Sequence, residues 1–198
     1  MSLKDLKHLY IFSCIMLGLI ILSPTLAMVL KLPGGDKFSE LWVLGPGLMV
    51  KDYPFIVSAN KVYKICLGVA NHMGDLEYYL VYLKFGNQTE ALPNLLNGNP
   101  SGLEPSFEYN IFLSENQNRA MDINFSFPEI SFEGNVCKII DIMIDNREFS
   151  AKKSISWDEE YNGYFFQIFF ELWRYNVTAE NFQYDNRFVC LWLNITKT

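Results

Sequence analysis

The chain has 198 residues, carries a formal net charge of −6 at pH 7, and is half hydrophobic. It contains no lysine- and arginine-rich run beyond the Lys152-Lys153 pair, so it lacks the basic surface with which proteins bind nucleic acid. Aromatic residues make up 16% of the chain, which is typical of a folded β domain rather than of a disordered chain.

The N-terminal residues form an apolar segment that has two interpretations. Residues 9–30 carry no charge, and their number matches the roughly 20 residues that cross a bilayer as a helix. Alternatively, Lys4 and Lys7 precede the apolar run of a signal peptide, with cleavage after Thr25-Leu26-Ala27. Because the apolar run continues past Ala27 to Leu30, the sequence favours an uncut membrane anchor. We therefore expect an N-terminal anchor or signal-like segment, residues 1–30, and an extracytoplasmic domain, residues 31–198.

Beyond this segment, apolar residues alternate with polar ones, which is the period of a half-buried β-strand. Residues 63–69 and 76–85 show this pattern on either side of the turn sequence NHMGD, so we expect a hairpin there. A long polar loop follows at residues 86–106, and further strands are expected at residues 121–127, 137–145, 161–175 and 188–196. About seven to nine strands without βαβ spacing predict a mostly β fold, an antiparallel Ig-like β-sandwich preceded by one transmembrane helix.

The four cysteines leave the disulfide pattern open. Cys14 lies in the apolar segment, and Cys66, Cys137 and Cys190 form an odd set, so one disulfide with a free thiol and no disulfide are both allowed. The alternation places Cys66 and Cys190 on the faces of their strands that point away from the core, where they could be joined, but Cys137 is an equally allowed partner. No CxxC unit occurs, so we expect no zinc site.

The sequence offers no set of catalytic or metal-binding residues. His72 is the only histidine beyond the apolar segment, and no nucleophile-elbow, zinc-protease or phosphate-loop motif occurs. The acidic run Asp158-Glu159-Glu160 directly precedes the turn signal Asn162-Gly163, so it is more typical of a solvated hairpin end than of a glycosidase carboxylate pair. Asp141 and Asp145 are read as an exposed strand face rather than as a calcium site. We expect no enzyme activity, no cofactor and no metal.

Several aromatic residues are expected on the face opposite the core. Phe165, Phe169 and Trp173 alternate with core residues of the strand at 161–175, and Trp192 lies on the outer side of the last strand. A fully solvated face would not carry them. Either loops cover this face, or it is an interaction face for a protein or glycan partner.

Four N-x-S/T sequons follow the apolar segment, which favours an external domain. They are at Asn87, Asn124, Asn176 and Asn194. Alternation predicts that the side chains of Asn124 and Asn194 point outward. Asn87 and Asn176 lie next to predicted loops, so we expect glycosylation there first, with Asn194 as the weakest site.

Five stretches together carry a family resemblance: KFSELWVLGPG at residues 37–47, DYP at 52–54, KICLGVANHMGDLEYYLVYLKF at 64–85, FFELWRYN at 169–176 and FVCLWLNIT at 188–196. In this order they resemble the archaeal membrane-protein family known as domain of unknown function 1616. The resemblance implies a cell-surface β domain that directly follows a membrane helix, and it brings no known activity or cofactor. Many relatives have several membrane helices, whereas this chain has room for one.

These observations favour a non-enzymatic, membrane-anchored archaeal cell-surface module that binds protein or glycan or forms part of an envelope assembly. We expect it to be single-pass, in contact with membrane lipid through its N-terminal helix, with the C-terminal domain outside. The alternative is an accessory single-helix subunit of a membrane protein complex. An enzyme acting on surface glycans is the least favoured of the three hypotheses.

Overall fold

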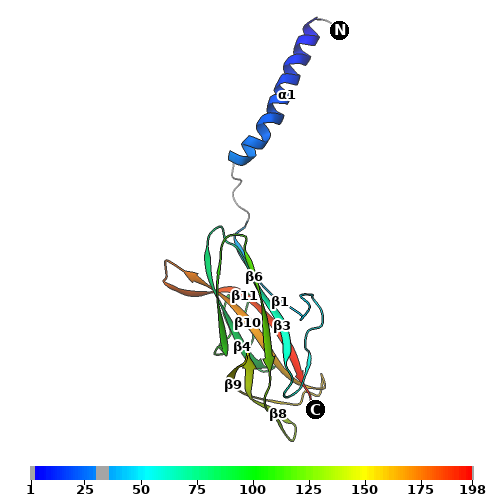
Figure 1. Cartoon of the computed structure of the whole chain (residues 1–198), viewed down its shortest axis with the longest axis vertical. Coiled ribbons are helices and arrows are strands. Elements are labelled where there is room, and N and C mark those ends of the chain that lie inside the picture. The colour runs from blue at the N-terminus through cyan, green and yellow to red at the C-terminus, as the bar shows by residue number, and fades with distance from the viewer. Residues whose placement is uncertain (1–2, 30–35, 198) are drawn as a thin grey trace. The chain divides into compact units, whose positions relative to one another are not determined.

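The computed structural model describes residues 3–29 and 36–197. The chain divides into two compact units, Met1–Lys37 and Phe38–Thr198 (Figure 1). The described residues of the first unit contain one helix, and those of the second form only strands, turns and loops. The division that the sequence predicts after residue 30 falls outside the described residues, so it stays a prediction.

Helix α1 (Leu3–Val29) is rich in residues that favour helices, such as leucine and methionine. Its four consecutive apolar side chains at residues 19–22 are all more than half exposed. Because consecutive helix residues point about 100° apart, this part of the helix presents apolar side chains on every side. No helix in the described part of the chain has both the length and the apolar character that a membrane span requires. The predicted transmembrane helix therefore stays a prediction.

The second unit consists of two β-sheets (Figure 1). Sheet A has the strand order β1 (Phe38–Leu44), β3 (Tyr63–His72), β6 (Asn118–Ser126), β8 (Val136–Ile144) and β7 (Ile130–Glu133), with β9 (Arg147–Ser156) also paired to β8. Sheet B has the order β2 (Ile56–Val57), β11 (Asn181–Ile195), β10 (Tyr164–Asn176), β4 (Glu77–Asn87) and β5 (Phe107–Leu113). Among the described strands, every pair is antiparallel except β2 with β11. The predicted mostly β fold with antiparallel sheets is confirmed.

The described residues contain eleven strands, more than the seven to nine that the sequence predicts. Strands β2 and β7 have two and four residues, which is too short for an alternating pattern to be recognised. Strand β9 has the sequence REFSAKKSIS, and only Ile155 within it is deeply buried. Strand β9 does have an apolar face, because Phe149 and Ala151 pack against the core beside Ile155, but Lys153 interrupts this face, so alternation does not reveal the strand.

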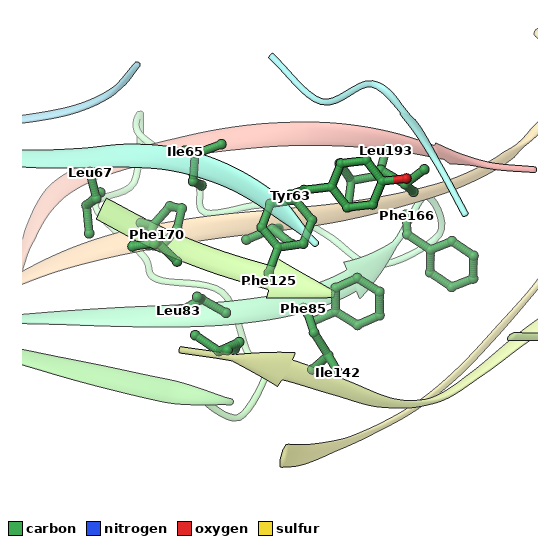
Figure 2. Close-up of a cluster of buried hydrophobic side chains, with 14 of the residues drawn as sticks. Tyr63, Ile65, Leu67, Leu83, Phe85, Phe125, Ile142, Phe166, Phe170 and Leu193 are labelled. Atoms are coloured by element: carbon green, nitrogen blue, oxygen red, sulfur yellow. The ribbon is translucent and has the colours of Figure 1, made fainter. Parts of the chain in front are cut away.

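Inward-facing side chains from both sheets form one hydrophobic core (Figure 2). Alternate residues of β10 from Tyr164 to Leu172 face this core, and Leu67 of β3 faces it from the other sheet. Phe85 and Phe166 stack there with ring centroids 5.6 Å apart. Burying one such side chain stabilises the fold by about 1.5–3 kcal/mol, so the core fixes which face of β10 points outward.

The strands define two ends of the sandwich. The near end holds the start of β1, where the chain arrives from residue 37, because Phe38 pairs with His72 at the end of β3. At the far end β4 finishes and β10 starts, since Phe166 pairs with Asn87. Strand β4 has 11 residues, so the two ends lie about 35 Å apart along the strands.

Hydrogen bonds around Asn71 close the near end. The amide nitrogen of Asn71 donates to the carbonyl oxygens of Asp75 (2.7 Å) and Leu113 (2.8 Å). The amide oxygen accepts from the backbone nitrogen of Met73 (2.9 Å) and the hydroxyl of Tyr79 (3.1 Å). Every polar atom of this fully buried side chain is therefore satisfied. The GVANH stretch thus has a structural role, because its asparagine holds the turn between β3 and β4.

Gly68 of β3 lies directly opposite Trp42 of β1 on the outer face of sheet A. A side chain at residue 68 would overlap the indole ring of Trp42. The two residues come from two of the stretches that carry the family resemblance. Their joint presence is therefore explained by packing between neighbouring strands.

All four cysteines are free thiols. Cys66 in sheet A and Cys190 in sheet B face away from the core, as predicted, whereas Cys137 lies within it. Cys66 and Cys190 therefore lie on opposite outer faces of the sandwich and cannot be joined. Of the alternatives that the sequence leaves open, the structure has the one without a disulfide.

Candidate ligand-binding site

The outer face of sheet B carries the aromatic residues that the sequence predicts there, and a loop covers its centre. This loop, residues 88–106, connects β4 to β5. Beneath it Gln167, Phe169 and Glu171 of β10 are each fully buried, although they point away from the core. Cover by a loop, one of the two alternatives from the sequence, therefore holds for the centre of the face.

A buried ion pair fastens the middle of the loop to the sheet. The ammonium of Lys84 lies 2.9 Å from Oε2 of Glu171, and both side chains are almost entirely inaccessible to water. Lys84 also donates to the carbonyl of Ser101 (2.9 Å), and the backbone nitrogen of Ser101 donates to Oε1 of Glu171 (2.8 Å). Two charges taken out of water are stable only with such additional hydrogen bonds. We call Lys84, Ser101 and Glu171 the buried clamp.

The start of the loop is fastened separately. The amide nitrogen of Gln167 donates to the carbonyls of Asn87 (3.1 Å) and Glu90 (3.2 Å). The carboxylate of Glu90 accepts from the backbone nitrogen of Asn87 (2.9 Å) and forms an ion pair with Lys153 of β9. These contacts therefore fix the position of Gln88, the next residue after Asn87.

At the far end the loop no longer covers the face, and a hollow of about 640 Å³ opens there. We call it the aromatic hollow, and it is lined by Phe55, Gln88, Asp158, Tyr161, Phe165 and Trp192. Of the predicted interaction face, Phe165 and Trp192 thus line an open site. Phe169 lies fully buried under the loop, and Trp173 is partly buried between Tyr82 and Tyr184, with ring centroids 5.5 and 5.8 Å away.

The aromatic rings of the hollow come from separate segments and remain open to solvent. Tyr161 is 66% exposed, Phe55 49% and Trp192 39%. Phe165 lies between two of them, with ring centroids 6.2 Å from Tyr161, edge to face, and 6.3 Å from Phe55. Trp192 belongs to the neighbouring strand, where it pairs with Gln167. The hollow therefore presents several ring surfaces around one partly buried phenylalanine.

A polar pair adjoins the rings. The amide nitrogen of Gln88 donates to Oδ2 of Asp158 (2.9 Å). Oδ1 of Asp158 accepts from the backbone nitrogens of Glu160 (2.9 Å) and Tyr161 (3.0 Å), and its backbone pairs with that of Gly163. Asp158 therefore organises the turn that presents Tyr161. The acidic run lies at a hairpin end, as the sequence indicates.

Three of the lining residues give no signal in the sequence. Phe55 precedes a strand of only two residues, Gln88 lies in a long polar loop, and Tyr161 lies in a turn. None belongs to a periodic pattern. Only the Asn162-Gly163 turn signal points to the place where Tyr161 is displayed.

The other candidate residues have structural partners. His72 stacks on Phe38 with ring centroids 4.7 Å apart, and its Nδ1 lies 3.0 Å from the side-chain oxygen of Asn116. Asp145 accepts from the backbone nitrogen of Asn124 (2.9 Å) and the hydroxyl of Tyr109 (3.1 Å). In the described part of the chain, no group of three histidine, cysteine, aspartate or glutamate side chains could hold a metal ion.

The four sequons differ in how their side chains are held. Asn87 donates to the carbonyl of Ser154 (3.1 Å), and Asn176 donates to the side chain of Gln183 (2.9 Å). Asn194 accepts from the backbone nitrogen of Tyr164 (3.3 Å) and lies against Gly163. The side chain of Asn124 is exposed, and it makes no hydrogen bond within the described residues.

Comparison with known proteins does not identify a family for this chain. No family model matches the chain, and no curated protein matches it. A β-glucosidase from Listeria innocua in complex with glucose has a TM-score of 0.39 at 7% identity, over 81% of this chain and 16% of that one. The CARDB domain of a Pyrococcus furiosus protein in complex with di-metal ions has a TM-score of 0.37 at 8% identity, and the match covers 81% of this chain and 88% of that one. A chain of the complex of zinc 2-glycoprotein and prolactin inducible protein from human seminal plasma has a TM-score of 0.39 at 10% identity. This match covers 83% of this chain and 99% of that one.

At these TM-scores the similarities bear on neither the family nor the function. The chain spans only a small part of the β-glucosidase that it resembles. The resemblance to domain of unknown function 1616 stays a prediction. Among the described residues, the aromatic hollow is the feature that best indicates a function.

Proposed function

We propose that the protein is a membrane-anchored, non-enzymatic cell-surface module, with an Ig-like sandwich that recognises a protein or glycan ligand through the aromatic hollow. The observation that carries this proposal is the hollow itself. Its rings at Phe55, Tyr161 and Trp192 remain substantially exposed, although neighbouring outward-facing side chains of the same sheet are fully covered. An apolar hollow left open beside a covered face is typical of a binding site.

The framework around the hollow favours binding without rearrangement. Asp158 holds the turn that carries Tyr161, and the fastened loop start holds Gln88. Because these side chains are already positioned, little conformational freedom is lost when a ligand binds.

The place of the hollow within the sandwich suits a tethered module. The chain enters the sandwich at the near end through Phe38, and the hollow lies at the far end, about 35 Å away along the strands. A ligand therefore reaches the hollow at the end of the sandwich opposite to Phe38.

Membrane attachment is supported by the composition of α1. Its exposed side chains from Tyr10 to Leu22 are almost all apolar and lie on every side of the helix. A helix that is apolar all round is stable only when it is surrounded by protein or lipid. The sequons that follow this segment support an external position for the sandwich.

A catalytic role is less well supported by the hollow. Of the described residues that line it, only Asp158 has a carboxylate, and both oxygens of that group already accept hydrogen bonds. Glycoside hydrolysis usually requires two carboxyl groups on opposite sides of the substrate.

The proposal is tested with full-length protein reconstituted in lipid nanodiscs and incubated with isolated envelopes of the source cells. The variant Phe55→Ala/Tyr161→Ala removes two exposed rings and should lower binding at least about tenfold. Phe112→Ala is the matched control, because Phe112 is 61% exposed at the near end of the same sheet and does not line the hollow. Equal binding by wild type and by the double variant would exclude the hollow as the binding site.

A further inference from the structure

We propose that the aromatic hollow binds an uncharged carbohydrate chain. This inference rests on the proposed function and specifies its ligand. It is based on three properties of the hollow: open ring faces, polar groups without partners, and the charge of its surroundings.

The ring faces suit sugars. A pyranose ring has an apolar face of C–H groups, which packs against the flat face of an aromatic ring through dispersion. Tyr161 and Trp192 offer such faces, because both are well exposed and Trp192 makes no ring contact within the described residues. A fatty acyl chain would instead need an enclosed channel, whereas these rings lie open at the surface.

Polar groups next to the rings have hydrogen-bonding capacity to spare. Gln88 uses one N–H to bind Asp158, and its amide oxygen makes no hydrogen bond within the described residues. Trp192 and Tyr161 are both exposed to solvent, and within the described residues neither the indole N–H nor the hydroxyl makes a hydrogen bond. An amide oxygen, a hydroxyl and an N–H donor can together serve the hydroxyl groups at the rim of a sugar ring.

The charge of the site excludes anionic ligands. Among the described residues no lysine or arginine lines the hollow, whereas Asp158 lines it, and Glu159 and Glu160 follow in the same turn. Phosphate, sulfate and uronic acid groups would be repelled there. Asp158, the charged residue in the lining given above, is already bound by Gln88 and two backbone N–H groups, so the lining offers no unbound carboxylate to a cationic peptide. An uncharged sugar chain is not repelled by the carboxylates and does not need one as a counter-charge.

The hollow is also of suitable size. Its volume of about 640 Å³ lies within the range of sites that hold a ligand of several rings. Its aromatic walls come from four separate segments: β10, β11, the turn at residue 161 and the segment at residue 55. Because the rings are spread over these segments, a short stretch of a longer sugar chain can contact several of them at once.

The first experiment measures binding of full-length protein in nanodiscs to an array of neutral oligosaccharides built from hexose and N-acetylhexosamine units. We expect at least one glycan to bind, with Trp192→Ala and Tyr161→Ala each lowering its affinity about tenfold. Trp192→Phe should retain part of the affinity, because it keeps a ring but loses the indole N–H. Phe112→Ala, which leaves the hollow intact, should bind as wild type does.

The second experiment separates this inference from the proposed function. Envelopes of the source cells are treated with periodate, which cleaves vicinal diols of sugars, or with protease. Loss of hollow-dependent binding after periodate but not after protease supports a carbohydrate ligand. Binding that survives periodate and is lost after protease overturns the inference while the proposed function stands. Binding that does not depend on Phe55 and Tyr161 at all overturns the proposed function itself.

Discussion

Lys84 and Glu171 form an ion pair that is almost completely removed from water, on the outer face of a sheet and not in the core between the sheets. The pair exists because the loop at residues 88–106 covers it and supplies the backbone groups of Ser101. The centre of the outer face of sheet B is therefore buried like a core, although it contains a pair of opposite charges.

Removing one member of this pair should destabilise the domain strongly. Glu171→Ala leaves the ammonium of Lys84 buried without a counter-charge, which typically costs about 3–5 kcal/mol of the free energy of unfolding. Urea unfolding followed by tryptophan fluorescence measures the change. Glu133→Ala is the control, because it breaks an ion pair with Lys138 that is largely exposed and is worth less than about 1 kcal/mol. A Lys84→Met/Glu171→Leu variant should recover much of the loss, and an unchanged stability of Glu171→Ala would contradict the buried clamp.

Gly68→Ala should also be destabilising, because its new methyl group overlaps the indole of Trp42. Overpacking of this kind costs about 1–3 kcal/mol. The matched control is Gly102→Ala, since within the described part of the chain no atom of another segment lies within 4 Å of a Cβ at that position. Thermal unfolding of both variants gives the comparison. Gly68→Ala should cost less stability when it is added to Trp42→Ala than when it is added to the wild type, because the indole is then absent. Equal costs in the two backgrounds would contradict the overlap.

The stability of the domain should fall under alkaline conditions. Burial raises the pKa of the Cys137 thiol from an ordinary 9.0 to about 12, and that of the Tyr79 hydroxyl from 10.0 to about 12. The folded state therefore favours the protonated forms, so their contribution to stability is complete below the unfolded pKa values and is lost as the pH rises toward 12. Urea unfolding at a series of pH values from about 8 to about 11 measures the slope. Cys137→Val should reduce it, and a stability that rises over this range would contradict the assignment.

The cysteines should behave as thiols. Burial also raises the pKa of Cys190 to about 11, so at neutral pH neither Cys137 nor Cys190 forms much of the reactive thiolate. We expect native protein to resist iodoacetamide at Cys66, Cys137 and Cys190 and to be labelled at all three after denaturation, with no mass change on reduction beforehand. Val62→Cys, placed at a residue that is 66% exposed, provides a position that should react quickly in the native protein. A mass gain on reduction would show that a disulfide is present.

Among the sequons, Asn124 should be modified most fully. Its side chain is exposed and makes no hydrogen bond within the described residues, whereas the amide of Asn194 is held against Gly163. The sequence favours Asn87 and Asn176, but both amide nitrogens are engaged in hydrogen bonds. Glycopeptide mass spectrometry of protein from the source cells gives the occupancy of each site. Full occupancy of Asn194 with none at Asn124 would contradict this order.

The N-terminal segment should be retained and should hold the protein in the membrane. The apolar side chains of α1 at residues 19–22 are exposed on all sides, and the apolar run of the sequence passes beyond the small-residue site at Ala27. Membranes washed with alkaline carbonate should keep the protein, and its N-terminal peptide should be detected by mass spectrometry. A soluble species that starts at Met28 would show instead that a signal peptide is cleaved.

The sequence predicts the parts of the fold that depend on alternation. The strands that contain Leu67, Leu83, Phe125 and Phe170 each have one apolar face, and the structure packs these faces together. It does not predict β2 or β7, because strands of two and four residues are formed by pairing with a neighbour.

The candidate site is also predictable only in part, because part of it depends on contacts between distant segments and not on a local pattern. Phe165 and Trp192 lie on regular strands, so their outward direction follows from their position relative to the core residues. Whether such a side chain is open or covered depends on the path of the loop at residues 88–106, which hides Phe169 and leaves Trp192 exposed. That path is fixed by the hydrogen bond from the backbone nitrogen of Ser101 to Glu171, two residues that lie 70 positions apart in the chain, and no local pattern reveals this contact.

The tip of the same loop can serve as a handle for labelling the protein. A pair of backbone hydrogen bonds between Asn94 and Asn99 closes the tip upon itself, Leu96 is 96% exposed, and Gly98 adopts a left-handed conformation there. The fastenings of the loop at Glu90 and Ser101 lie outside this short closed turn. A peptide epitope inserted between Asn97 and Gly98 should therefore leave the sandwich folded, since exposed loop tips tolerate insertions well. Antibody staining of intact cells through that epitope would report directly on which side of the membrane the sandwich resides.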